Sequence, residues 1–301
     1  MRNKRQLPAA VIIAAVLLAL PMTAGAATVK DQLGRTVDLP PDPRRVVALA
    51  PNITEIIFAL GQQQRLKGVT TYSDYPTAAQ QIPKVGSYIR LDLERIVALK
   101  PDLCIATRDG NPRALIDRLE SLHIPVFAVD PQSLESVIQT VHDLGAILNA
   151  AERADSLVQA MRVRIQRVRT RVAAASTRPR VFFQVGIAPV IAAGTDTFVD
   201  ELIVYAGGKN CVTGKTAYPR FSREQVLVLN PDVMIISSMA RGAAFEKIRK
   251  EWYRWSNLSA VRHNRIHVVN ADLFNRPSPR LVDSLELLAR LIHPKLFEEA
   301  R

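Results

Sequence analysis

Two glutamates stand at matching places in two similar stretches of the chain. Glu94 lies in LERIVALKPDLCI, and Glu224 lies 130 residues later in EQVLVLNPDVMI. In both stretches the glutamate is followed by aliphatic residues, a Pro-Asp pair and a second apolar run. An exposed carboxylate forms strong, charge-assisted hydrogen bonds with a basic partner, above all with arginine. The repeated pattern therefore predicts two acidic docking points, one in each half of the protein.

Each of these glutamates is expected in the first turn of a short helix. Asp92 and Ser222 are favourable N-cap residues two positions before them. A capping-box acid would stand three positions after the cap, where the chain has Arg95 and Gln225. We therefore expect the glutamate side chains to point outward. The alternative is that they only offset the helix dipole, a contribution of about 0.3–1 kcal/mol.

Residues typical of catalysis do not form a recognisable group. The Gly-x-Ser-x-Gly motif of serine hydrolases is absent, and the five histidines are scattered. His263 and His267 are four residues apart, but RHNRIHVV is predicted as turn and strand, so they would not share a face and we expect no metal site. The segment AGGKN lacks the pattern of a phosphate-binding loop. We expect a protein that is not an enzyme and has no cofactor.

The elements that must position these residues alternate between strands and helices. In the first half, the apolar runs RVVALA, RLKGVTTY, DLCIAT and PVFAVD alternate with helical segments at 52–60, 92–99, 113–122 and 134–148. In the second half, strands are expected in RVFFQVG, DVMIISS and RIHVVN, and the last helix from Ser278 with Pro279 at its first position. This alternation predicts an α/β fold with parallel-type sheets flanked by helices.

A long segment without Gly or Pro separates the two halves. Its apolar residues recur at helical spacing and leave the arginines on the other face, which predicts one long amphipathic helix over about 151–175 (Leu157, Met161, Ile165, Val168 and Val172). We therefore expect an N-terminal lobe at 27–150, a rigid connecting helix at 151–176 and a C-terminal lobe at 177–301. A ligand cleft is expected between the lobes.

The first residues predict export. The charged stretch MRNKRQ is followed by an apolar run of about 15 residues, shorter than the ~20 that span a bilayer, and by the cleavage site Ala24-Gly25-Ala26. An uncleaved membrane anchor is the alternative. No cysteine follows the cleavage site, so we expect no lipid anchor there. The segment 1–26 is thus predicted to be a signal peptide of a periplasmic, monomeric protein that does not itself span the membrane.

Charge and cysteine content narrow the partners further. The formal net charge of +12 becomes +9 when Arg2, Lys4 and Arg5 leave with the signal peptide. This excess would favour nucleic-acid binding in the cytoplasm, but export argues against that partner. Cys104 and Cys211 lie in different halves. They could form one disulfide between the lobes or stay free and buried, and the second reading is favoured.

Several segments together resemble the helical-backbone class of substrate-binding proteins of ABC importers. They are PRRVVALAPNITEIIFALG, GVTTYSDYP, LERIVALKPDL, VFFQVGIAP, YAGGKN, YPRFSREQVL and DLFNRPSPRL. Within this class the chain is most similar to the cobalamin-binding members of vitamin B12 uptake, over essentially the whole mature length. YSDYP and the D-x-F-x-R-x-S-P-R run are the more specific parts. The resemblance implies capture of a corrinoid in the periplasm and its delivery to a membrane permease.

The resemblance also implies roles for individual residues. Tyr72 would contact the corrinoid, and Tyr88 and Tyr218 stand where the relatives have tryptophans. The segment DLFNR would supply Asp272, Phe274 and Arg276, whose acidic and basic ends reach the ligand. Glu94 and Glu224 would bind arginines of the two permease subunits.

Departures from the family pattern keep the ligand open. Val185 and Ile191 replace phenylalanines of the cobalamin binders, so the cleft would be less aromatic. A haem or ferric-siderophore binder of the same architecture is therefore the alternative; haem would need an axial Tyr or His, such as Tyr72 or Tyr88. The tyrosines also suit plain structural roles. Asp272 and Arg276 also suit a surface ion pair.

Overall fold

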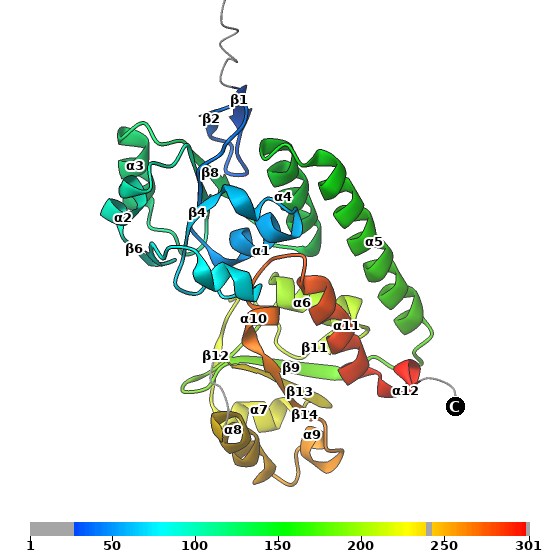
Figure 1. Ribbon diagram of the computed structural model, residues 1–301. Coiled ribbons are helices and arrows are strands. Elements are labelled where there is room, and N and C mark those ends of the chain that lie inside the picture. Colours follow the sequence, from blue (N-terminus) through cyan, green and yellow to red (C-terminus); the bar gives the residue numbers. More distant parts are fainter. Residues whose placement is uncertain (1–26, 239–242, 299–301) are drawn as a thin grey trace, which may run out of the picture.

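The computed structural model describes residues 27–238 and 243–298 and shows two α/β lobes (Figure 1). The N-terminal lobe lies at the top of the view and the C-terminal lobe at the bottom. The predicted signal peptide, residues 1–26, lies outside the described residues. Within the described ranges, no helix combines the length and the apolar character needed to cross a membrane.

The N-terminal lobe is built on a four-stranded parallel sheet in the order β4-β3-β7-β8. Its strands are buried on both faces, which explains why they read as continuous apolar runs. They are β3 (Val46–Ala48), β4 (Leu66–Val69), β7 (Leu103–Thr107) and β8 (Val126–Val129). The helices are α1 (Pro51–Ala59), α2 (Leu93–Ala98), α3 (Arg113–Ser121) and α4 (Leu134–Ile147). The predicted alternation of four strands and four helices is confirmed.

The N-terminal lobe also contains two short hairpins and two 3₁₀ turns outside its main sheet. They are the hairpin β1 (Ala27–Lys30) and β2 (Thr36–Leu39), the 3₁₀ turns η1 (Gln63–Arg65) and η2 (Thr77–Gln81), and the hairpin β5 (Gly86–Ser87) and β6 (Arg90–Leu91). The strand expected in RLKGVTTY ends at Val69 as β4. Tyr72 therefore lies in the loop that follows the strand, beyond its carboxyl end.

The long helix α5 (Ala151–Ala173) runs along the right side of both lobes in Figure 1. It buries Met161, Ile165, Val168 and Val172, as the helical spacing predicted. It packs against α4 of the N-terminal lobe and against α6 and α11 of the C-terminal lobe. Because α5 packs against helices of both lobes, it is part of the core of each lobe rather than a flexible linker between them.

The C-terminal lobe contains a mixed six-stranded sheet in the order β12-β10-β9-β13-β14, with β11 also paired to β9. The strands are β9 (Arg180–Gly186), β10 (Val190–Ala192), β11 (Lys209–Asn210), β12 (Arg220–Phe221), β13 (Val233–Ser238) and β14 (Ile266–Asn270). Strands β10 and β12 run antiparallel to their neighbours. The expected parallel sheet is thus extended by two antiparallel strands. Strands β9 and β10 form a hairpin, because the connection after β9 is too short for a crossover, and β12 pairs with the far edge of β10.

The helices of this lobe include one whose start differs from the prediction. They are α6 (Phe198–Tyr205), α7 (Arg223–Leu229), α8 (Ala243–Tyr253), α9 (Ser259–Arg262), α10 (Ala271–Phe274), α11 (Leu281–Ile292) and α12 (Pro294–Phe297). Helix α11 begins at Leu281 instead of just after Ser278, so Pro279 is not its first residue. The Ser278 hydroxyl donates a hydrogen bond to the Glu55 carboxylate at 2.6 Å, which draws the segment before α11 toward the other lobe.

Both cysteines are free and buried, which decides between the two possibilities left open by the sequence. Cys104 belongs to β7 in the N-terminal core, and Cys211 follows β11 in the C-terminal core. Burial raises the pKa of the Cys104 thiol to about 12 and that of Cys211 to about 11. Each side chain acts as a small apolar core residue.

Candidate ligand-binding site

A pocket of about 1130 Å³ lies between the lobes and is lined by residues of both. Its N-terminal wall includes Asn52 after β3 and Thr107 at the end of β7. Its C-terminal wall includes Asn270 at the end of β14. The carboxyl ends of parallel strands therefore face the pocket from both sides, the usual position of a ligand site in such sheets.

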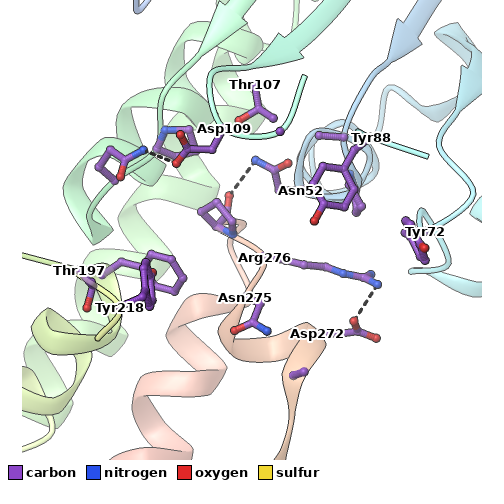
Figure 2. Close-up of a pocket in the computed structure, with 18 of the residues that line it drawn as sticks. Asn52, Tyr72, Tyr88, Thr107, Asp109, Thr197, Tyr218, Asp272, Asn275 and Arg276 are labelled. Carbon is purple, nitrogen blue, oxygen red and sulfur yellow. Dashed lines mark hydrogen bonds and ion pairs between the residues drawn. The ribbon is translucent and has the colours of Figure 1, made fainter. Parts of the chain in front are cut away.

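Three tyrosines predicted from the sequence line this pocket (Figure 2). Tyr72 follows β4, and Tyr88 lies in the turn between β5 and β6; their rings meet edge to face, with centroids 6.1 Å apart. Tyr218 comes from the opposite lobe, before β12. The exposed fractions of these residues are 45%, 37% and 45%, so each ring retains a large free surface. A tyrosine in this setting offers a ligand both a ring face and a hydroxyl. Their contact with a ligand stays a prediction.

Two neighbouring residues hold Tyr88 in place. Gly110 has a φ of 103°, and a side-chain Cβ there would lie 2.4 Å from the Tyr88 ring. Glycine is thus required both by the backbone conformation and by the close approach of the ring. The Asn111 amide donates hydrogen bonds to the carbonyl oxygens of Tyr88 at 2.8 Å and Leu49 at 2.9 Å. These contacts fix the tyrosine turn against the end of the central sheet.

Arg276 lines the pocket, but its guanidinium is held by acidic residues. It lies 2.9 Å from Asp272, 2.7 Å from Asp74 and 3.1 Å from Glu55. The residue is only 9% exposed. The surface ion pair considered as an alternative is therefore a buried, branched network that connects the lobes. Asp272 also lines the pocket, and it lies in the short helix α10 that directly follows β14.

Glu55, which the sequence analysis did not single out, is the centre of this network. It lies on α1, is 4% exposed, and accepts hydrogen bonds from Ser278, Arg276 and Arg280 of the other lobe. Burial raises the pKa of its carboxyl group, which the hydroxyl and the two guanidinium groups oppose. The Arg280 guanidinium also lies 3.7 Å from the centre of the Tyr75 ring. The sequence did contain a signal for this buried acid: Glu55 is the one charged residue in the segment PNITEIIFALG.

Phe274 does not line the pocket, which corrects the expectation that it contacts the ligand. Its exposed fraction is 0%, and its ring packs against Phe183 with centroids 5.2 Å apart. The side chain is directed into the core because α10 presents that face to the sheet. Its neighbour Asn275 lines the pocket instead.

Two carboxylates that the sequence did not point to also line the pocket. Asp109 follows β7 and Asp196 precedes α6, so they come from opposite lobes, and both are exposed. Asp109 accepts a hydrogen bond from the Gln132 amide at 3.1 Å. Burial, and then the negative charge of Asp109, raise the pKa of the Tyr218 phenol. In the view of Figure 2, Asp109 and Tyr218 lie toward one end of the pocket, and Tyr72 and Asp272 toward the other.

Glu94 and Glu224 lie outside the pocket, at the starts of α2 and α7, and both are exposed. The predicted caps are present: the Asp92 side chain accepts a hydrogen bond from the backbone of Arg95. Ser222 forms a capping box in which Gln225 takes the role usual for an acid. A hydrogen bond from its own backbone N–H, and one from the Ser222 hydroxyl, lower the pKa of Glu224.

Each of these glutamates is accompanied by an exposed valine about one helical turn later. Val97 is 38% exposed and Val228 is 86% exposed. Residues three or four positions apart share a helix face. Each lobe thus presents a carboxylate beside an apolar side chain.

Comparisons with known proteins agree with this architecture. The family model described as periplasmic binding protein matches residues 46–273. The chain is 31% identical over 278 residues to an uncharacterised ABC transporter substrate-binding lipoprotein, YvrC, of Bacillus subtilis, covering 90% of this chain and 87% of that protein.

Two solved structures of similar fold bind different macrocycles. The periplasmic vitamin B12 binding protein BtuF of Vibrio cholerae is 30% identical with a TM-score of 0.75, covering 86% of this chain and all (100%) of that one. A periplasmic heme binding protein of Pseudomonas aeruginosa is 29% identical with a TM-score of 0.76, covering 84% and 93%. The overall likeness is therefore equal for the two ligand types.

Proposed function

Because the chain belongs to the periplasmic binding protein family, we propose that it captures cobalamin or a related corrinoid between its lobes and delivers it to an ABC-importer permease. The observation that carries this proposal is the large pocket lined by tyrosines from both lobes. The similarity to a vitamin B12 binding protein over nearly its whole length supports it. In this role the protein is a binding protein of the periplasm and not an enzyme.

The size and lining of the pocket favour a large, flat ligand. Its volume of about 1130 Å³ exceeds the usual ~300–1,000 Å³ of pockets for drug-sized molecules. Tyr72 and Tyr88 on one lobe and Tyr218 on the other provide ring faces on both sides. Polar groups at the strand ends, such as Asn52, Thr107 and Asn275, offer hydrogen bonds to an amide-rimmed macrocycle. A single ion or amino acid would leave most of this space unfilled.

The same residues are less suited to haem, the main alternative. A haem iron takes an axial histidine, cysteine, methionine or tyrosine, and a tyrosine ligand is ionised. Of the described residues that line the pocket, none is a histidine, a cysteine or a methionine. Burial and the neighbouring Asp109 charge raise the pKa of the Tyr218 phenol, which opposes its ionisation. Tyr72 and Tyr88 remain the axial candidates that a haem-binding function would require.

Delivery to the permease is assigned to Glu94 and Glu224. Their carboxylates lie on separate lobes and outside the pocket, so the protein can hold its ligand while it contacts two membrane subunits. Arginines on the permease are the proposed partners, since carboxylate–guanidinium pairs are strong and geometrically selective. A monomer is sufficient for this arrangement.

Isothermal titration of the mature protein tests the proposed ligand. We expect one site per chain for cyanocobalamin and weaker or no binding of haem and of a ferric siderophore. An absorbance spectrum of protein purified with its natural ligand gives an independent reading. Heat with haem or the siderophore, but none with cobalamin, would overturn the proposal in favour of the alternative.

A further inference from the structure

The pocket between the lobes carries an excess of negative charge. Of the described residues that line it, four are aspartates and one, Arg276, has a positively charged side chain (Asp74, Asp109, Asp196 and Asp272). The Arg276 guanidinium already contacts Asp74, Asp272 and Glu55 at 2.7–3.1 Å. At this end of the pocket the carboxylates are thus paired with protein guanidinium groups, because Glu55 also contacts Arg280 at 3.2 Å. The one positively charged side chain among the described lining residues is therefore occupied by protein carboxylates.

At the other end of the pocket, around Tyr218, no described residue forms an ion pair with Asp109. The pKa of the neighbouring Arg108 guanidinium is nevertheless raised, chiefly by its hydrogen bond to Asp130 and in part by the negative charge of Asp109. Asp109 and Asp196 both line the pocket and are exposed. Asp196 directly precedes Thr197, which Figure 2 shows beside Tyr218, and Asp109 is hydrogen bonded to the neutral amide of Gln132. Arg108 is the nearest basic residue along the chain. Its guanidinium is engaged by Asp130 at 2.8 Å, and it is not among the described residues that line the pocket. Asp109 and Tyr218 of the opposite lobe line the same pocket, and burial, followed by the Asp109 charge, raises the pKa of the Tyr218 phenol.

We propose that Asp109 and Asp196 select ligands by charge, so that the pocket accepts a macrocycle rimmed by neutral amides or bearing positive charge and rejects one rimmed by carboxylates. This inference rests on the proposed function and specifies the chemical class of its ligand. An amide donates hydrogen bonds to a carboxylate, whereas a ligand carboxylate beside the same aspartate is repelled. Like charges placed opposite each other in a partly desolvated site disfavour the wrong partner strongly. The same rule disfavours haem, whose two propionates would enter the cleft.

Two probes with the same ring separate charge from shape. Cobinamide is a corrin rimmed by amides, and cobyrinic acid is the same corrin rimmed by carboxylic acids. At pH 7 and low salt, we expect the mature protein to bind cobinamide at least about tenfold more tightly than cobyrinic acid in calorimetric titrations. Raising the salt concentration screens exposed charges, so the ratio of the two affinities should fall.

The matched variant is Asp109→Asn with Asp196→Asn. Asparagine keeps the size of the side chain and can still accept the hydrogen bond from Gln132. Asparagine also tolerates the left-handed backbone of Asp196, whose φ is 61°. We expect the double variant to bring the two affinities within about threefold of each other, and each single variant to narrow the ratio partly.

The control makes the same change of net charge away from the pocket, at the exposed residues Asp117 of α3 and Asp155 of α5. Asp117→Asn with Asp155→Asn should leave the ratio of the wild type unchanged. Equal binding of both corrins by the wild type, or an unchanged ratio in the Asp109 and Asp196 variant, overturns the charge selection while the proposed function stands. If the folded protein binds neither of these corrins nor cyanocobalamin, both the proposed function and the selection are wrong; if it binds cyanocobalamin alone, only the selection is wrong.

Discussion

The guanidinium of Arg276 lies 3.1 Å from the carboxylate of Glu55, although the two residues are 221 positions apart and belong to different lobes. Glu55 also accepts hydrogen bonds from Ser278 and Arg280. The segment between α10 and α11 is thereby attached to α1 of the N-terminal lobe. A further hydrogen bond, from the Asn52 amide to the Pro277 carbonyl, joins the same two segments. The lobes are held by a buried polar network next to the pocket as well as by the long helix α5.

Removing the Glu55 carboxylate should destabilise the protein. In Glu55→Ala the Ser278 hydroxyl loses its acceptor and two guanidinium groups lose a buried partner, which typically costs about 3–5 kcal/mol. We expect about 3 kcal/mol, the lower end, because Arg276 keeps Asp74 and Asp272. Urea unfolding gives the value. Glu135→Ala, which removes an exposed pair with Arg162, is the control and should cost about 0–1 kcal/mol. Equal effects of the two changes would contradict the role of the network.

Tyr72 should contribute its ring to ligand binding. Tyr72→Ala removes an aromatic ring from a residue that lines the pocket and is 45% exposed, and we expect the affinity for corrinoid to fall by about 1–3 kcal/mol. Tyr72→Phe keeps the ring and loses only the hydroxyl, so it should lie closer to the wild type. Calorimetric titration of the three proteins measures both contributions. An unchanged affinity in a folded alanine variant would return Tyr72 to a structural role.

Ligand binding and delivery should be separable through the docking glutamates. Glu94→Arg with Glu224→Arg turns two attractive contacts with permease arginines into repulsive ones, but the changes lie outside the pocket. We expect normal corrinoid affinity and a loss of uptake in cells that lack their own binder. Because each glutamate contributes only about 0.3–1 kcal/mol as a first-turn acid, the fold should persist. Replacing the exposed Glu152 and Glu298 by arginine is the charge-matched control, and it should leave uptake normal. Normal uptake in the Glu94 and Glu224 variant would show that these residues do not dock the permease.

The two cysteines should resist thiol reagents in the native protein. Their thiols are buried, and their pKa values are raised to about 12 for Cys104 and about 11 for Cys211, so little thiolate is present at pH 8. We expect negligible alkylation by iodoacetamide until urea unfolds the chain, after which both react. Mass spectrometry counts the modified sites. Rapid labelling of either cysteine under native conditions would contradict the burial.

The pair between α5 and α11 should make part of the stability depend on pH. The hydrogen bond from Arg164 holds the pKa of Glu286 below its ordinary value of 4.5. A lowered carboxyl pKa means that the stabilisation is present above pH 4.5 and is lost as the pH falls through the lower, folded-state value. The difference in unfolding free energy between the wild type and Glu286→Gln should therefore be positive at pH 7 and shrink below about pH 4.5. Urea titrations from pH 7 to pH 3 measure it, and a difference that stays constant would refute the linkage.

Local sequence pattern was sufficient to predict the elements and the exposure of the residues at their starts, although the Glu224 carboxylate also accepts a hydrogen bond from its cap residue Ser222. Strands β3, β7 and β8 and helix α5 follow from hydrophobic periodicity, because period and burial are properties of neighbouring residues. The helix starts that expose Glu94 and Glu224 likewise follow from the capping residues Asp92 and Ser222. The short strands β10 and β12 were not predicted, because two or three residues show no clear hydrophobic period. They form through pairing, β10 with β9 and β12 with β10.

The full set of residues that line the pocket could be identified only from the tertiary structure. The family resemblance identified four residues that do line the pocket: Tyr72, Tyr88, Tyr218 and Asp272. It also suggested Phe274, whose side chain instead packs on Phe183 in the core. The burial of Glu55 depends on partners in the other lobe, and Asp109 and Asp196 line the same pocket from opposite lobes, so each arrangement combines residues separated by long stretches of chain. Such arrangements depend on the relative orientation of the two lobes, which cannot be read from the hydrophobic period or the residue spacing of any one segment. The sequence therefore shows what each lobe is made of, whereas the charge and shape of the space between the lobes arise only when they come together.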